Sequence, residues 1–232
     1  MSQSQIQNRL LQKLTPSDLD AVMSCATRVD LAFKQEIMVR GDVISYVYFP
    51  EDCVCSLIAQ TDHARPIEVG MVGPEGMSDM VSRIGDRTAL TSIVQVAGAA
   101  WRIRTEDFIR LIHSAPSFDE VTRRFKDALA IQFAYTAFAN GNFKVEERLS
   151  RWLLMSHDRS RQDTVPMIHQ FMAMMLAIRR SGVTTATHIL EGAGAIKGLR
   201  GAIEIRDRDK LLEIAGESYG TPEAEYERLM VH

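Results

Sequence analysis

The stretch IHQFMAMMLAIRRSGVTTATHIL, residues 168–190, decides how the C-terminal part of this chain folds. Both halves of the stretch carry apolar residues at the spacing of one buried helix face. These residues are Phe171, Met172 and Met175 in the first half, and Val183, Ala186 and Leu190 in the second. Residues 177–180 between them fit a short turn. The stretch therefore predicts two helices that pack against each other across that turn.

The outward face of the second helix is rich in cations and small hydroxyl groups. Its members are Arg179, Arg180, Ser181, Thr184, Thr185 and His188. Arginine is suited to phosphates and to guanine edges, and Ser or Thr can contact bases or backbone without steric bulk. The pattern favours a recognition helix for the DNA major groove. An ordinary helical hairpin with a polar face remains the alternative at this point.

A basic turn and a short strand follow the second helix. Residues 191–196 end that helix, residues 197–201 supply a turn that contains Lys197 and Arg200, and residues 202–205 alternate like a strand. A two-stranded wing with these two cations near its tip would lie beside the phosphate backbone and set register rather than sequence. Further helices are expected over residues 210–216 and from residue 221 onwards.

Length and composition indicate a soluble protein with room for two domains. The chain has 232 residues, of which 46% are hydrophobic and 25% charged. We find no apolar run of the roughly 18 residues that a membrane span needs, and no signal-peptide pattern at the start, so we expect a cytoplasmic protein. The net charge is −3, yet residues 148–200 hold eight basic and three acidic residues, as a polyanion-binding surface would.

In the N-terminal half the residue pattern changes from helical to strand-like. Residues 6–27 are predicted to be helical, with a cap at Thr15. Short segments rich in Val, Ile, Tyr and Phe then alternate with turn signals, which indicates a sandwich or barrel. These segments are residues 36–39, 46–49, 54–59, 67–71, 90–96 and 100–103. Cys53 and Cys55 share one strand face, where they are either ordinary half-buried residues or redox or metal groups.

A long helix is predicted between this region and the C-terminal part, because residues 119–139 contain neither Gly nor Pro. One seam on it is spaced by three and four, as a partner helix requires. The seam consists of Val121, Phe125, Ala128, Gln132 and Tyr135. We interpret the seam as the contact with a twin helix in a homodimer; a core helix of one domain is the alternative. Residues 140–142 form a candidate hinge.

Several motifs give the whole chain a recognisable pattern. They are VYFP at residues 47–50, VGPEGM at 72–77, EERLSRWLL at 146–154, HQFMA at 169–173 and RRSGVT at 179–184. The chain resembles the cyclic-AMP receptor protein / fumarate-nitrate reduction regulator (Crp/Fnr) family, and the last two motifs are the most specific. The resemblance implies an α+β fold with a cupin-like double-stranded β-helix (jelly-roll) barrel and a C-terminal winged helix-turn-helix. The sensor barrel would span residues 1–143, with a dimerisation helix at about 117–140, and the DNA-binding domain residues 144–232.

The resemblance implies a homodimeric transcription regulator rather than an enzyme. Each subunit would bind one half of a near-palindromic double-stranded site, about one DNA turn from the other half. The DNA contacts would come from His169, from the outward helix residues and from the wing cations. Ser181 and Thr185 replace the Glu and Arg common in the family, so we expect a different target. RNA polymerase would be a partner if the protein activates transcription.

The effector motif of the family is only partly present. Members that bind cyclic nucleotides carry Gly-Glu and then, ten residues after the Glu, Arg-(Ser/Thr)-Ala. Here Arg87 and Thr88 fit, but Met77 follows Gly76 and cannot accept a hydrogen bond from a ribose hydroxyl as a carboxylate would. Phe133 stands where cyclic-AMP-responsive members place a hydroxyl, and an unpaired base group costs about 1–3 kcal/mol. We therefore expect an effector other than cyclic AMP, of unidentified chemistry; a cyclic-nucleotide-responsive regulator of the same fold is the alternative.

Other classes of function fit less well. Three cysteines are too few for the four-cysteine iron–sulfur sensors of the family, whereas a haem-responsive regulator using His63 or His113 stays open. A cupin-type enzyme needs two or three His with a carboxylate on one strand face, and the barrel segment offers only His63. A module that binds protein instead of DNA would not explain the basic bias and the wing. We predict no metal or cofactor.

Overall fold

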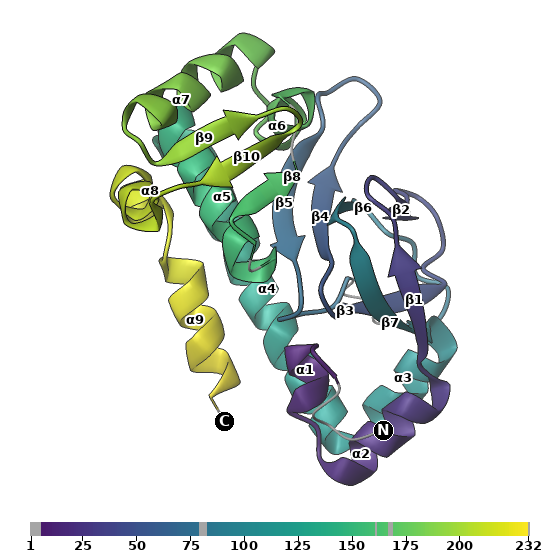
Figure 1. Ribbon diagram of the computed structural model, residues 1–232. Helices are drawn as coiled ribbons and strands as arrows, with labels where there is room; N and C mark the ends of the chain where they lie inside the picture. The colour runs from purple at the N-terminus through teal and green to yellow at the C-terminus, as the bar shows by residue number, and fades with distance from the viewer. Residues whose placement is uncertain (1–5, 79–82, 161, 167–168, 232) are drawn as a thin grey trace.

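The computed structural model describes residues 6–78, 83–160, 162–166 and 169–231, with the side chains of residues 169 and 170 excepted. Figure 1 shows two β-sheets in the N-terminal half, a long helix that leaves them, and a smaller helical part with its own hairpin at the far end. None of the helices in the described ranges combines the length and the apolar composition of a membrane-spanning segment.

The N-terminal sheets form a jelly-roll barrel of antiparallel strands. One sheet has the order β1-β7-β3, with β1 at Thr27–Leu31, β7 at Gly98–Arg104 and β3 at Tyr46–Pro50. The other has the order β2-β6-β4-β5, with β2 at Glu36–Met38, β6 at Thr91–Val96, β4 at Val54–Ala59 and β5 at Ile67–Val72. The predicted barrel and its strand segments are confirmed, whereas β1 was not predicted.

The N-terminal helix is shorter and more broken than the sequence suggested. Instead of one helix over residues 6–27, the chain forms α1 (Arg9–Gln12) and α2 (Pro16–Cys25). The side chain of Asn8 caps α1, and Thr15 caps α2 as predicted. Thr27, the last residue of the predicted helix, begins β1, an edge strand that pairs with β7 and is mostly exposed. Val29 and Leu31 alternate with the exposed Arg28 and Asp30, but this stretch is too short to separate a strand from the end of the predicted helix.

The predicted long helix exists and extends further than expected. After α3 (Thr105–Ser114), α4 runs over Pro116–Asn142, with Pro116 in its first turn. Residues 140–142 are helical, so the hinge predicted there is wrong. The chain leaves the helix at Phe143 instead, where the backbone becomes extended with φ −113° and ψ 151°.

The α4 seam that we assigned to a dimer contact lies inside the subunit. Four of its members, Val121, Phe125, Ala128 and Gln132, are buried in the single chain, and Tyr135 is half-buried. The C-terminal helix α9 (Thr221–Met230) packs along α4 (Figure 1), and the Gln132 amide bonds to the Met71 backbone in β5. The seam is a core contact because the chain returns about 100 residues later to cover it.

The C-terminal part begins with α5 (Val145–Ser160). It continues through β8 (Thr164–Pro166), α6 (His169–Met175), α7 (Arg180–Gly192), β9 (Ile196–Leu199), β10 (Ala202–Ile205), α8 (Arg208–Ala215) and a 3₁₀ turn at Gly216–Ser218 before α9. The predicted pair of helices and the wing hairpin are confirmed. The strand β8 was not predicted, because three residues are too few to show a period.

Helix α5 is buried on both sides. The eight consecutive residues Leu149 to Ser156 are all buried. Trp152, Leu153 and Leu154 belong to one apolar cluster with barrel strand residues and with the helices of the C-terminal part. A polar chain crosses the same contact: Ser56 in β4 donates to Gln95 in β6 at 2.7 Å, and the Gln95 amide donates to Ser156 in α5 at 2.9 Å. Barrel and C-terminal part are therefore one packed body.

Glu68 of β5 is a buried carboxyl at this contact, and one of its oxygens lacks a hydrogen-bond partner in the described structure. Burial raises the pKa of Glu68 from its ordinary 4.5 to about 7, against the lowering effect of the nearby Ser56 and Trp152 side chains and of the Arg151 and Arg159 charges. Only the unfolded chain loses this proton between pH 4.5 and 7. The contribution of Glu68 to stability therefore falls as pH rises through that window.

We predict that Glu68→Gln removes this pH dependence. The variant should be more stable than the wild type at pH 8, by up to about 3 kcal/mol, and similar to it at pH 4.5. Urea unfolding at the two pH values measures the difference. Glu36→Gln, at an exposed position of the same sheet, is the control and should follow the wild type. Equal unfolding free energies of Glu68→Gln and wild type at pH 8 would contradict the prediction.

Candidate nucleic-acid interface

The two helices α6 and α7 pack across their turn as the spacing predicted. All six apolar residues chosen from the sequence are buried, namely Phe171, Met172, Met175, Val183, Ala186 and Leu190. Arg148 of α5 donates a hydrogen bond to the Leu176 carbonyl at 2.6 Å and so fixes the end of α6. Ala177 next to it takes a left-handed conformation with φ 51°, which turns the chain towards α7.

The face of α7 that points away from this core is cationic and open. Its predicted residues Arg179, Arg180, Ser181, Thr185 and His188 are exposed, and Thr184 is half-buried. In the part of the chain that the structure describes, neither Arg179 nor Arg180 has an ion-pair partner. His188 lies 3.3 Å from the Glu191 carboxylate on the next turn. His169 begins α6, but its side chain lies outside the described residues.

The hydroxyls of α7 are oriented by the helix itself. Thr184 donates to the Arg180 carbonyl at 3.1 Å, and Thr185 donates to the Ser181 carbonyl at 3.0 Å. Their protons are therefore used, while the oxygen lone pairs and the methyl groups stay available. In this arrangement the hydroxyls can accept a hydrogen bond from a base amino group, and the methyl groups can contact a thymine methyl.

The wing lies beside α7 (Figure 1) and forms a small sheet of order β8-β10-β9. Its turn bends at Gly201, whose φ of +78° suits a residue without a side chain. Lys197 and Arg200 are exposed near this turn. The Gly198 amide donates to the Glu191 carboxylate at the end of α7 at 2.7 Å, which ties the wing to that helix.

The match to a family model covers this part of the chain. Residues 147–214 match the Crp-like helix-turn-helix domain, a range that includes most of α5, the helix pair and the wing. No curated protein matches the chain in sequence.

Solved structures share the fold of the chain at low identity. FixK2 from Bradyrhizobium japonicum superposes with a TM-score of 0.69 at 14% identity, over 82% of this chain and 98% of that one. TTHB099, a CRP-family regulator from Thermus thermophilus, gives 0.64 at 20%, over 82% and 96%. The c-di-GMP responsive regulator CLP from Xanthomonas campestris gives 0.64 at 14%, over 82% and 99%. The chain is a DNA-binding transcription regulator of the Crp/Fnr type.

Three of the five residues expected to bind an effector in this Crp/Fnr-type regulator lie in closely packed surroundings. Met77 is fully buried in the barrel core, and Gly76 lies so close to the ring of Phe125 that a Cβ would be 2.3 Å from it. Phe133 covers Gly70 of β5 in the same way.

The other two expected residues, Arg87 and Thr88, form hydrogen bonds to backbone carbonyls of the barrel. Arg87 is exposed and donates to the Gly41 carbonyl at 2.6 Å, and the Thr88 hydroxyl donates to the Leu90 carbonyl at 2.8 Å. The effector assignment by motif position thus gains no support from the geometry.

Haem or metal binding likewise gains no support from the described residues. His63 and His113 are both exposed, and among the described residues no group of three or more His, Cys, Asp or Glu could hold a metal ion. Cys53 and Cys55 are fully buried, deeper than the half-buried positions expected. A hydrogen bond with Cys53 and then burial raise the pKa of the Cys55 thiol.

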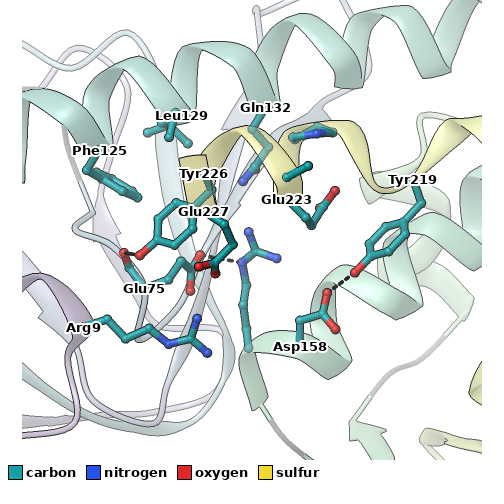
Figure 2. A pocket seen from close by; sticks show the side chains of 14 residues that line it. Arg9, Glu75, Phe125, Leu129, Gln132, Asp158, Tyr219, Glu223, Tyr226 and Glu227 are labelled. Atoms are coloured by element: carbon teal, nitrogen blue, oxygen red, sulfur yellow. Dashed lines mark hydrogen bonds and ion pairs between the residues drawn. The ribbon is translucent and has the colours of Figure 1, made fainter. Parts of the chain in front are cut away.

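A buried ion pair, which the sequence did not reveal, joins the barrel to the DNA-binding part. Arg159 of α5 contacts Glu75, in the turn after β5, at 2.7 Å, with side chains only 9% and 10% exposed (Figure 2). Burial disfavours the charge of Arg159, but the carboxylates of Glu75, Glu223 and Asp158 outweigh it and raise the pKa of the guanidinium. Tyr226 of α9 donates to the Glu75 carbonyl at 2.8 Å.

The same junction extends to the C-terminal helices. Asp158 of α5 accepts a short hydrogen bond from the Tyr219 hydroxyl and pairs with Arg208 of α8 at 2.7 Å. A cavity of about 470 Å³ opens beside these groups, between α4, the end of α5 and α9. Nothing in the sequence pattern paired Glu75 with Arg159, because the two residues are 84 positions apart.

We predict that breaking this pair destabilises the protein strongly. Arg159→Met leaves the Glu75 carboxylate buried and unpaired, which should cost about 3–5 kcal/mol in urea unfolding. The double variant Glu75→Gln/Arg159→Met should lose less than Arg159→Met alone, because no buried charge remains. If the unfolding free energy of Arg159→Met lies within about 1 kcal/mol of the wild-type value, the prediction fails, because exposed ion pairs contribute only that much.

Proposed function

We propose that this regulator acts as a homodimer in which residues 1–143 sense a signal and residues 144–232 bind DNA. Each subunit inserts α7 into the major groove of one half of a near-palindromic site. The observation that carries the proposal is the exposed face of α7, which presents arginines without acidic partners in the described structure next to a basic wing. Such a face is complementary to the edges and phosphates of a DNA groove.

Roles within the interface follow from position. Arg180 starts α7, where recognition helices place their base-reading residues, and Ser181, Thr184, Thr185 and His188 continue along the same helix. Arg179, Lys197 and Arg200 lie at the ends of the surface and are suited to phosphates, as is His169 at the start of α6. Base contacts carry specificity and phosphate contacts carry affinity, so the two groups should respond differently to substitution.

The dimer contact is proposed on the open side of α4, away from α9. This side carries small residues at intervals of four, three and four, which let two helices approach closely. They are Ala130, Ala134, Ala137 and Gly141, all exposed. Phe138 beside them is 49% exposed and would add apolar contact area to such an interface. The proposal requires a two-fold axis here that sets the two α7 helices about one DNA turn apart.

Control by an effector is proposed to act through the junction of Figure 2. Its cavity has the volume of a small-molecule site, for which about 300–1,000 Å³ is usual. The cavity is lined from the barrel side by Glu75 and from the DNA-binding side by Arg159, so a molecule bound there would touch both parts. We also propose that the protein is cytoplasmic. If it activates transcription, it would contact RNA polymerase.

We predict that Arg180→Ala removes the preference for the cognate site and leaves the dimer intact. A bidentate arginine–guanine contact is worth about 1–3 kcal/mol of discrimination, and a dimer loses two of them. The ratio of affinities for cognate and random duplexes, measured by fluorescence anisotropy, should fall at least tenfold. Arg28→Ala, at an exposed barrel position, is the matched control. An unchanged ratio for Arg180→Ala would reject Arg180 as a base reader.

We predict that Ala134→Arg converts the dimer to a monomer. The bulky cation would meet its symmetry mate on the proposed axis, while the exposed position spares the fold of the subunit. Analytical ultracentrifugation should show half the wild-type mass with a melting temperature close to that of wild type. Ala21→Arg, an exposed alanine of α2, should remain dimeric. A dimeric Ala134→Arg protein would place the interface elsewhere.

A further inference from the structure

A second basic element lies beside the start of α7, and it comes from the barrel. The connection between β4 and β5 rises towards α6 at the end of the molecule where α7 lies (Figure 1). Arg65, in this connection, lines one hollow of about 480 Å³ together with Arg179 and Arg180. The floor of the hollow is formed by Pro66 and by apolar residues of the helix pair.

The position of this connection is fixed by local contacts. Arg40 pairs with Asp62 at 2.6 Å, and the Ala64 amide donates to the Thr61 hydroxyl at 3.2 Å. Arg65 precedes a proline, which biases its backbone towards an extended conformation. The neighbouring β1–β2 turn also contacts the helix pair, since the rings of Phe33 and Phe171 lie 6.3 Å apart. These contacts therefore fix the β4–β5 connection, and with it Arg65, beside the start of α7.

The charges around the hollow are uncompensated. All three arginines are exposed, and no acidic residue lines the hollow. Within the described ranges, none of the three forms an ion pair. Three guanidinium groups around one hollow repel one another unless an anion lies between them. An arginine fork fits a phosphate group bidentately, and the hollow is continuous with the DNA-reading face of α7.

We propose that Arg65 contacts the phosphate backbone of the DNA that α7 reads, so that the sensor barrel forms part of the DNA interface. The contact lies at the edge of the half-site, where α7 enters the groove. It gives the barrel a direct influence on DNA affinity, since any shift of the barrel against α6 moves Arg65 relative to the backbone. This inference deepens the proposed function and rests on α7 as the DNA-binding helix.

The test is the salt dependence of binding by the full-length protein between 50 and 200 mM KCl, with a cognate duplex obtained by selection of bound sites from a random pool. Each phosphate contact contributes about 0.9 to the slope of log K against log salt, so Arg65→Ala should lower the slope by about 1.8 for a dimer. Affinities for cognate and random duplexes should fall by the same factor, because phosphates carry no sequence information. Arg65→Lys, which retains the charge, should keep a slope close to that of wild type.

Arg28→Ala again serves as the control, because it removes the same charge from an exposed barrel position outside the hollow. An Arg65→Ala slope equal to that of wild type overturns the inference. Equal losses of slope in Arg65→Ala and Arg28→Ala also overturn it, because they report only the net charge of the barrel. Wild-type protein that binds no duplex overturns the proposed function as well, whereas normal wild-type binding with an unchanged Arg65→Ala slope overturns this inference alone.

Discussion

The fold depends on the burial of helix α5 between two partners. Residues Leu149 to Ser156 are buried without interruption, with the barrel strands on one side and the helices of the DNA-binding part on the other. Fully burying one large apolar side chain stabilises a fold by about 1.5–3 kcal/mol, so the leucines and tryptophan of α5 bind the two parts together strongly. Neither part can turn against the other without exposing this helix. Movement of the barrel and movement of α7 are therefore coupled.

The polar groups at the same contact make that coupling sensitive to chemistry. Apolar packing alone would hold the parts together under most conditions. The buried Glu75–Arg159 pair and the buried Glu68 carboxyl instead make the contact depend on charge. A ligand that separates the Glu75–Arg159 pair, or loss of the Glu68 proton, changes the free energy of docking directly, by several kcal/mol for a pair left incomplete. This is the physical form that signal transfer takes in the proposed function, since the groups lie between the sensing barrel and the DNA-reading helix.

Local patterns in the sequence were enough to predict the local structure. The helix pair, the wing hairpin and most barrel strands follow from spacing and turn residues within about 20 positions of each other. The dimer seam was misplaced because α4 has two apolar sides, and only the return of α9 decides which one the subunit covers itself. The Glu75–Arg159 ion pair was not predicted either, because its two members lie in segments that are far apart in the sequence. The effector residues were transferred by motif position, and Arg87 in fact points to Gly41. Contacts between distant segments leave no periodic trace in a sequence.

The central claim, that two copies of α7 read DNA as a pair, is tested most directly by selection of bound sites from a pool of random duplexes with the full-length protein. The account predicts enrichment of an inverted repeat whose half-site centres lie about 10 base pairs, or one helical turn, apart. Recovery of no enriched sequence, or of a single element without a symmetric mate, would contradict the account.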